Sequence, residues 1–319
     1  MPVRFTSPGL AGRTASTLKP RQWQIDVAYR HLYANEWFVG TQVKESAAPF
    51  GQPLYLNIHS LDLGVEYGVT KQLSMVLTLP FSYGSQSRYY PDQQRHEVSG
   101  SGLGDMSLVA NYWLLDPFKP AKGNVAVGVG VKMPTGSNTL SQAVSLANGT
   151  VVQPPMDQSV QLSDGGWGVI VQGQAYRQVY RRLSAYTYGW YLISPEDRTG
   201  VPSPIKGETL SVPDVYSFRV GASYAISAKR GFSTTFGTRI DGIPVYDLIG
   251  ESNGFRRPGY TVYLEPGIAF GRGPSSFTLS VPLRVHQNFK RGPVDIQNNF
   301  AGGGDLANAL VLMGYSVRF

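Results

Sequence analysis

The chain has no cysteine and no run of eighteen apolar residues. The first absence excludes disulfides, thiolate metal sites and cysteine nucleophiles, and the second excludes helical membrane spans. Charged residues are scarce, at 15% of 319 residues, and the lysines and arginines behind the net charge of +7 are scattered. Because nucleic-acid binding needs clustered positive charge, we expect no nucleic-acid partner.

Histidine is also rare, and no two of His31, His59, His96 and His286 have the spacing of metal ligands. We therefore expect no metal site and no cofactor. The first residues, MPVRFTSPGL, lack the apolar core of a signal peptide. If the protein is exported, we expect this chain to be the mature form, with Met1 in place of the removed leader.

Glycine (37 residues) and tyrosine (19 residues) are abundant. This composition suits strands and turns better than helices, because glycine and aromatic residues are weak helix formers. The mean hydropathy of −0.16 is close to neutral. Such a value is expected when each strand has one apolar and one polar face.

Alternation of apolar and polar residues predicts twelve strands, each long enough to cross a bilayer when tilted. They lie near residues 21–33, 57–69, 72–83, 103–115, 123–133, 166–179, 183–194, 214–227, 231–242, 259–271, 275–287 and 307–319. The segment 183–194 is the least regular, since aromatic residues fall on both of its faces. An error of two strands in the count would arise there.

The connections between these strands alternate strictly in length. Joins after even-numbered strands are short, as at residues 70–71 and 180–182, and joins after odd-numbered strands are long, as at 84–102 and 134–165. This pattern predicts an all-β fold, a transmembrane antiparallel up-and-down β-barrel of about twelve strands with short periplasmic turns and long extracellular loops. The barrel would span residues 21–319, and residues 1–20 would form a periplasmic tail or a plug.

The polar face of each strand should line the interior, because an Arg or Lys facing lipid near the bilayer midplane costs about 2–4 kcal/mol. The candidate lumen or constriction residues are Arg30, Glu66, Lys132, Arg219, Arg239, Glu265, Arg284 and His286. Two interpretations stay open. The charges form ion pairs that fill a narrow barrel, or some of them line a constriction that selects solutes.

An outer-membrane lipid hydrolase would need a serine and a histidine in hydrogen-bonding reach. The nearest fragments are His59–Ser60 and His286–Asn288. Adjacent residues of a strand point to opposite faces, so His59 and Ser60 cannot pair without a bulge. We therefore predict that the protein is not an enzyme, with a lipid hydrolase as the remaining enzymatic alternative.

Three fragments together resemble a family of bacterial outer-membrane proteins named for the meta-pathway of phenol degradation. They are Tyr67–Met75 (YGVTKQLSM), Gly100–Leu108 (GSGLGDMSL) and Val131–Ser137 (VKMPTGS). The resemblance implies a barrel that transports small solutes, including aromatic or hydrophobic compounds, and it carries over no binding residue.

The final segment, ALVLMGYSVRF, resembles the last strand of outer-membrane proteins, which commonly ends in Phe. This resemblance implies that Tyr315, Val317 and Phe319 form the signal read by the barrel-assembly machinery. The leading hypothesis is an outer-membrane channel in contact with membrane lipids and lipopolysaccharide. The alternative is a closed barrel that serves as a structural or interaction scaffold and binds a partner through its long loops; the sequence does not identify that protein partner.

Overall fold

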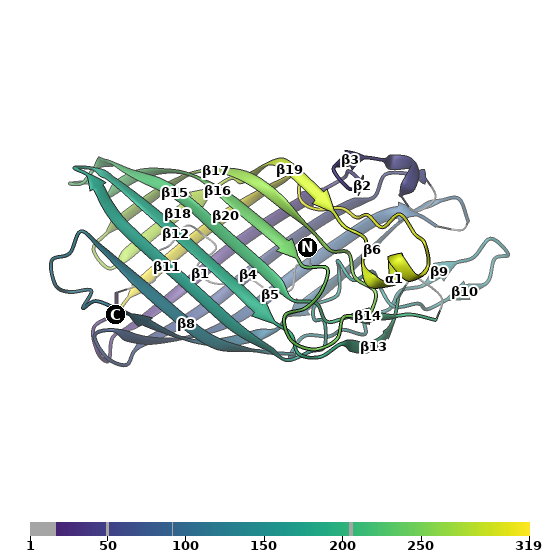
Figure 1. Ribbon diagram of the computed structural model, residues 1–319, viewed down its shortest axis with the longest axis horizontal. Coiled ribbons are helices and arrows are strands. Elements are labelled where there is room, and N and C mark those ends of the chain that lie inside the picture. Colours follow the sequence, from purple (N-terminus) through teal and green to yellow (C-terminus); the bar gives the residue numbers. More distant parts are fainter. Residues whose placement is uncertain (1–16, 49–50, 91, 204–206) are drawn as a thin grey trace.

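A computed structural model describes residues 17–48, 51–90, 92–203 and 207–319, and these form one tilted β-barrel (Figure 1). Twelve strand positions make up the wall, and two of them are occupied by broken strands. In wall order they are β1(Trp23–Ala34), β4(Tyr55–Gly68), β5(Leu73–Tyr89), β6(Arg95–Leu103) with β7(Met106–Trp113), β8(Gly123–Met133), β11(Gly168–Tyr180), β12(Leu183–Ile193), β15(Val215–Ser227), β16(Phe232–Ile243), β17(Gly259–Arg272), β18(Ser275–Ser280) with β19(Leu283–Phe289), and β20(Ala309–Arg318).

The sheet closes on itself. Strand β1 pairs antiparallel with β20, from Gln24 opposite Arg318 to Tyr33 opposite Ala309. Closure pairs the last strand with the first, so the strand at the chain terminus is paired with β1 on one side and with β18 on the other. The predicted twelve-stranded antiparallel barrel is confirmed, including the doubtful strand β12.

The two ends of the barrel differ as predicted. The short turns and the C-terminus lie at one end, and the long connections lie at the other (Figure 1). The long connections contain the small elements β2(Phe38–Val39), β3(Gln42–Val43), η2(Glu45–Ala47), β9(Val144–Ser145), β10(Val151–Val152), β13(Arg198–Pro202), β14(Thr209–Ser211) and α1(Pro293–Gln297). Across the residues that the structure describes, no helix is long and apolar enough to cross a membrane.

The alternation of side chains settles which face of the wall is outside. On β8, Val125, Val127, Val129 and Val131 are 40–58% exposed, whereas Ala126 and Lys132, on the other face, are each 1% exposed. An apolar outer face and a mixed inner face are the pattern of a membrane barrel, the reverse of a soluble one. The predicted assignment of faces is confirmed for this strand.

One predicted loop is a hairpin instead. Residues 84–102 were expected to be a connection, but β5 continues to Tyr89 and pairs with β6 from Phe81 opposite Leu103 to Tyr89 opposite Arg95. The prediction was wrong because Ser, Gly and Gln in this segment give no clear apolar face. Only the backbone pairing across the hairpin shows that these residues extend the two strands.

A tight turn shows why glycine is needed at one rim position. Gly231, between β15 and β16, has a φ of +68°, and a Cβ atom there would lie 1.7 Å from the carbonyl oxygen of Gly271. Both the backbone conformation and the close approach therefore require glycine. This turn keeps β15 and β16 in register with the neighbouring β17.

Candidate functional site: the barrel interior

The inner face of the wall has two kinds of surface. Apolar side chains gather toward the long loops, and charged and polar side chains occupy much of the remaining inner face. The two kinds of surface meet where Leu312 lies opposite Arg30 and Tyr263 lies opposite Arg239. Strand β4 shows the change along its length, since Leu56 and Ile58 precede Asp62 and Glu66 on the same face. All four side chains are at most 5% exposed.

Arg219 and Arg239 face each other directly across β15 and β16. Each has its own carboxylate. Arg219 Nη2 donates to Glu265 Oε1 at 2.8 Å, and Arg239 Nε donates to Asp241 Oδ2 at 2.7 Å. The two carboxylates offset the repulsion between the guanidinium groups, which are each only 2% exposed. This group confirms the predicted ion pairs of Arg219 and Arg239.

Lys132 has two carboxylate partners. Its Nζ atom lies 3.1 Å from Asp105 Oδ2 and also contacts Asp164 Oδ1. Asp105 lies between β6 and β7, while Asp164 belongs to the long connection before β11. The ammonium group therefore ties the end of that connection to the wall. The sequence does not predict this contact, because nothing near Asp164 in the chain indicates a distant lysine.

Arg30 and Glu66 also lie on the inner face, at 7% and 5% exposure. Arg30 Nη2 donates to Ser60 Oγ at 3.3 Å, and Gln24 Nε2 donates to Glu66 Oε2 at 3.3 Å. The structure thus places both predicted residues in the interior.

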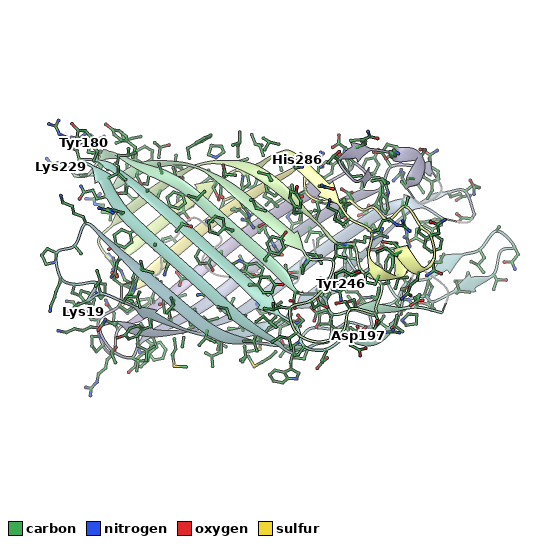
Figure 2. The ribbon with its side chains drawn as sticks, viewed as in Figure 1. Lys19, Tyr180, Asp197, Lys229, Tyr246 and His286 are labelled. Atoms are coloured by element: carbon green, nitrogen blue, oxygen red, sulfur yellow. The ribbon has the colours of Figure 1, made fainter. Side chains whose placement is uncertain are left out.

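Arg284 and His286 fall on different faces. Arg284 is half-buried and forms an ion pair with Glu36 of the first long connection. His286 lies on the outer face, with its ring centroid 5.8 Å from that of Tyr260 (Figure 2). The pairing of β17 with β19 skips Val285, and this bulge reverses the alternation that placed His286 inside. His286 is therefore not a lumen residue.

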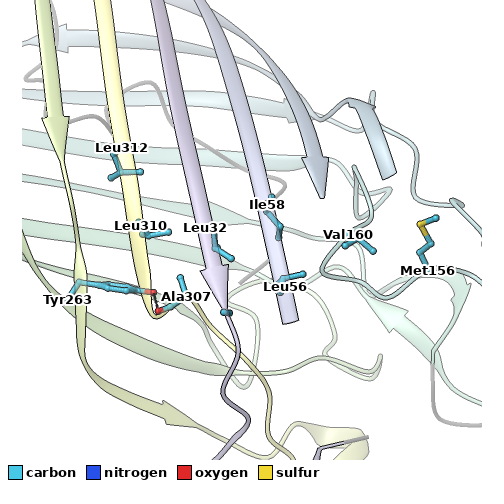
Figure 3. Close-up of a cluster of buried hydrophobic side chains, with 10 residues drawn as sticks. Leu32, Leu56, Ile58, Met156, Val160, Tyr263, Ala307, Leu310 and Leu312 are labelled. Atoms are coloured by element: carbon cyan, nitrogen blue, oxygen red, sulfur yellow. Dashed lines mark hydrogen bonds between the residues drawn. The ribbon is translucent and has the colours of Figure 1, made fainter. Parts of the chain in front are cut away.

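Apolar side chains cover the inner wall near the long loops. One cluster combines Leu32, Ala34, Leu56, Ile58, Tyr263, Ala307, Leu310 and Leu312 from the wall and its rim with Met156 and Val160 from the connection between β8 and β11 (Figure 3). Tyr263 Oη donates to the carbonyl oxygen of Ala307 at 3.2 Å, so its polar group is satisfied. We call this group the upper apolar cluster.

A second apolar cluster lines other strands of the wall. It contains Val76, Val109, Ile170, Tyr188, Trp190, Leu192, Val215 and Ile243. Leu192, Val215 and Ile243 lie near the long loops, whereas Val76 lies farther down the wall, opposite Glu66. Neither cluster was predicted from the sequence, although Leu310, Leu312 and Ile58 stand on the strand faces assigned to the lumen.

The wall is irregular beside the upper apolar cluster. The regular pairing between β17 and the next strand runs from Gly267 opposite Ser280 to Leu264 opposite Leu283, and so omits Val281 and Pro282. Both still make backbone hydrogen bonds, because the N–H of Val281 donates to the carbonyl oxygen of Pro266 at 3.0 Å and the N–H of Leu310 donates to that of Pro282 at 2.9 Å. Pro266 and Pro282 have no N–H group to donate. Tyr263, Leu310 and Leu312 lie on the two strands that flank this break.

Two carboxylates of the long connections have shifted pKa values. Burial alone would raise the pKa of Asp157, but the charges of Arg257 and Arg88 outweigh it and hold that pKa below its ordinary value of 3.8. Burial raises the pKa of Asp305 well above its ordinary value. Asp157 therefore contributes a negative charge beside two arginines at neutral pH, close to Met156 and Val160.

The arrangement of His59 and Ser60 bears on the hydrolase alternative. His59 Nδ1 hydrogen-bonds Tyr29 Oη at 2.7 Å, and its ring stacks on His31. Ser60 faces the interior and hydrogen-bonds Ser82 Oγ at 3.1 Å. The two groups lie on opposite faces of the wall, so they do not form a nucleophile and its base. Within the described ranges, no group of three or more His, Asp or Glu side chains is arranged to hold a metal ion.

Comparison with solved structures finds the same fold in an outer membrane channel. The COG4313 outer membrane channel from Pseudomonas putida F1 aligns with a TM-score of 0.65 at 14% identity, over 99% of this chain and 100% of that one. The Ralstonia pickettii toluene transporter TbuX aligns with a TM-score of 0.45 at 10% identity, over 95% of this chain and 90% of that one. The likeness is one of fold. No family model matches the chain, and no curated protein matches it in sequence.

The predicted assembly signal lies at the end of β20, where the barrel closes. Tyr315 and Phe319 are exposed, and the backbone N–H of Phe319 donates to the carbonyl oxygen of Trp23 at 2.9 Å. Tyr315 Oη lies 3.1 Å from Ser275 Oγ on the adjacent strand. The segment is thus paired to β1 on one side and β18 on the other.

Proposed function

We propose that this protein is a channel of the bacterial outer membrane that lets small hydrophobic molecules pass. The observation that carries the proposal is the upper apolar cluster, because the interior of a water-filled porin is polar. An apolar inner wall favours solutes that leave water readily. The similarity in fold to an outer membrane channel supports the same conclusion, as does the resemblance to the meta-pathway family.

The break at Val281–Pro282 suggests how such a solute enters. Two prolines, which lack an N–H group, interrupt the regular ladder where the wall borders Tyr263, Leu310 and Leu312, although backbone hydrogen bonds of Val281 and Pro282 still cross it. We propose that solutes move between the membrane and the upper apolar cluster at this place. This route spares a hydrophobic molecule from crossing the charged layer in an aqueous column.

The charged residues would then determine which solutes pass along the axis of the barrel. We propose Arg30, Glu66, Lys132, Arg219, Arg239, Glu265 and Arg284 as constriction residues, and His286 is left out because it faces outward. Residues 1–16, most of the predicted tail or plug, lie outside the described residues. Lipopolysaccharide contact at the long-loop rim and recognition of Tyr315, Val317 and Phe319 by the assembly machinery stay predictions.

Uptake of a fluorescent naphthylamine into proteoliposomes tests the proposal. Leu310→Asp puts a charge into the upper apolar cluster, and we expect it to slow uptake by about tenfold, because an unpaired charge in apolar surroundings is strongly disfavoured. Thr78→Asp is the matched control. It adds the same charge to the inner wall of β5, outside both apolar clusters, and should leave uptake close to that of the wild type.

A scaffold is the second candidate function, and the pairing of Arg219, Arg239 and Lys132 with carboxylates favours it. Single-channel conductance in a planar bilayer separates the two. Ion-selective openings that change in Arg239→Ala would place the constriction at the paired arginines. A folded barrel that is silent in the bilayer and takes up no naphthylamine would be a scaffold.

A further inference from the structure

Exposed positive charge gathers at the short-turn end of the barrel. The turns there carry Lys71, Lys119, Lys122, Arg181, Arg182, Lys229 and Arg230, all exposed. Figure 2 shows Lys229 at this end of the barrel. Asp116 is the only acidic residue in these turns, all of which the structure describes. Under the proposed function this end faces the periplasm, so the basic rim lies at the level of the phospholipid headgroups of the periplasmic leaflet.

A groove runs along the outer face of the wall directly beside this rim. It has a volume of about 690 Å³ and spans β8, β11, β12 and β15. The small side chains of Ala175 on β11 and Thr187 on β12 lie opposite each other on its floor. Val125 of β8 lies opposite Ala175 on one side, and Val220 of β15 lies opposite Thr187 on the other. Leu114 and Leu115 of the adjacent turn border it.

The size and lining of the groove suit an acyl chain. Sites that hold small ligands have volumes of about 300–1,000 Å³ and are mainly apolar. Elsewhere on the outer face larger side chains stand in rows, as Val127, Val129 and Val131 do on β8. The hollow therefore arises from Ala175, Ala185 and Thr187, where the wall has small residues on neighbouring strands.

A basic side chain lies at the end of this groove. Arg177 is part of its lining and is exposed, and Arg181 and Arg182 follow in the turn between β11 and β12. The ion pairs formed by the described residues include none of these three arginines. Arg182 Nη1 donates to the carbonyl oxygen of Ile226, and the Arg181 guanidinium lies over the ring of Tyr180.

We propose that this groove binds one anionic phospholipid of the periplasmic leaflet, with an acyl chain over Ala175 and Thr187 and its phosphate at Arg177 and Arg181. Charge complementarity selects this occupant, since an apolar slot that ends in unpaired guanidinium groups matches a chain that ends in a phosphate. The inference rests on the membrane location of the proposed function, but it does not require an open channel.

Native mass spectrometry of the detergent-solubilised barrel, titrated with phosphatidylglycerol, tests the proposal. We expect one retained lipid per barrel, bound about tenfold more weakly in Arg177→Gln/Arg181→Gln, because each basic group near an anionic lipid contributes to its binding. Ala175→Trp should fill the groove and abolish retention of this lipid. Lys71→Gln/Arg272→Gln is the matched control, since it removes two charges from the rim on other strands and should leave binding unchanged.

Equal weakening in both double variants would overturn the proposal, because binding would then follow net rim charge alone. Undiminished binding in Ala175→Trp would overturn it as well. Heat-modifiable gel mobility shows whether each variant is folded, and Thr187→Leu is a milder filling variant with the same expected direction. Since lipid retention is measured without transport, failure of the channel proposal would leave this result intact.

Discussion

The charged layer of the interior and its upper apolar cluster are both buried in the same barrel, yet they are stabilised differently. In the charged layer each group depends on a particular partner, as Arg219 does on Glu265 and Lys132 on Asp105 and Asp164. In the upper apolar cluster, contacts are spread over many side chains with no directional requirement. The comparison suggests that the first region sets the shape of the lumen and the second adapts to a solute.

The largest effect is expected from Lys132→Met. This change leaves Asp105 and Asp164 buried next to each other with no cation, and breaking a buried ion pair costs about 3–5 kcal/mol. We expect the upper end of that range, because two carboxylates lose their partner. Urea unfolding in detergent, followed by tryptophan fluorescence, measures the free energy of unfolding. The triple variant Lys132→Met/Asp105→Asn/Asp164→Asn should recover most of the loss, and no recovery would contradict the assigned pairing.

Arg219→Ala should cost less, about 3 kcal/mol, although it also breaks a buried pair. Glu265 keeps a hydrogen bond from Ser280 Oγ at 2.9 Å, and Arg239 lies directly across from the vacated position. The same unfolding measurement applies. The double variant Arg219→Met/Glu265→Leu leaves no unpaired charge and should be more stable than Arg219→Ala. A double variant that is less stable would show that the pair is not what stabilises this part of the wall.

Leu312→Ala tests the other region and should cost about 2 kcal/mol, the low end for truncating a buried leucine. The cost is small because a lumen side chain has neighbours that can move into the space. The same variant should raise naphthylamine uptake, since it removes apolar bulk and so widens the space within the cluster without adding charge. Leu63→Ala, on the lipid-facing side of β4, is the control that loses a similar side chain from the outer face. Equal uptake in the two variants would mean that the upper apolar cluster does not take part in transport.

The contrast between the regions also explains what the sequence could predict. Alternation along each strand is a local property, so the number of strands, the inward position of Arg219 and Lys132, and the alternation of short and long connections were all accessible. The pairing of Lys132 with Asp164 was not, because the two residues meet only after the connection between β8 and β11 has folded against the wall. His286 was misplaced because a bulge of one residue at Val285 leaves no signal in the alternation.

The smallest effect is expected from pH at the place where this connection meets the upper apolar cluster. Because the pKa of Asp157 is held below its ordinary value of 3.8, its charge stabilises the fold above that value, and this contribution is lost as the pH falls through the lowered pKa. Asp157→Asn should therefore destabilise the barrel at pH 7, on the order of 1 kcal/mol, and should match the wild type at low pH. Thermal unfolding at pH 7 and pH 2 measures both. Asp92→Asn is the control, because its half-buried carboxylate takes its lowered pKa first from the backbone N–H of Gln94 and then from the hydrogen bond of His96, rather than from arginine charges. A difference between Asp157→Asn and wild type that is as large at pH 2 as at pH 7 would mean that shape, rather than charge, holds this connection against the cluster.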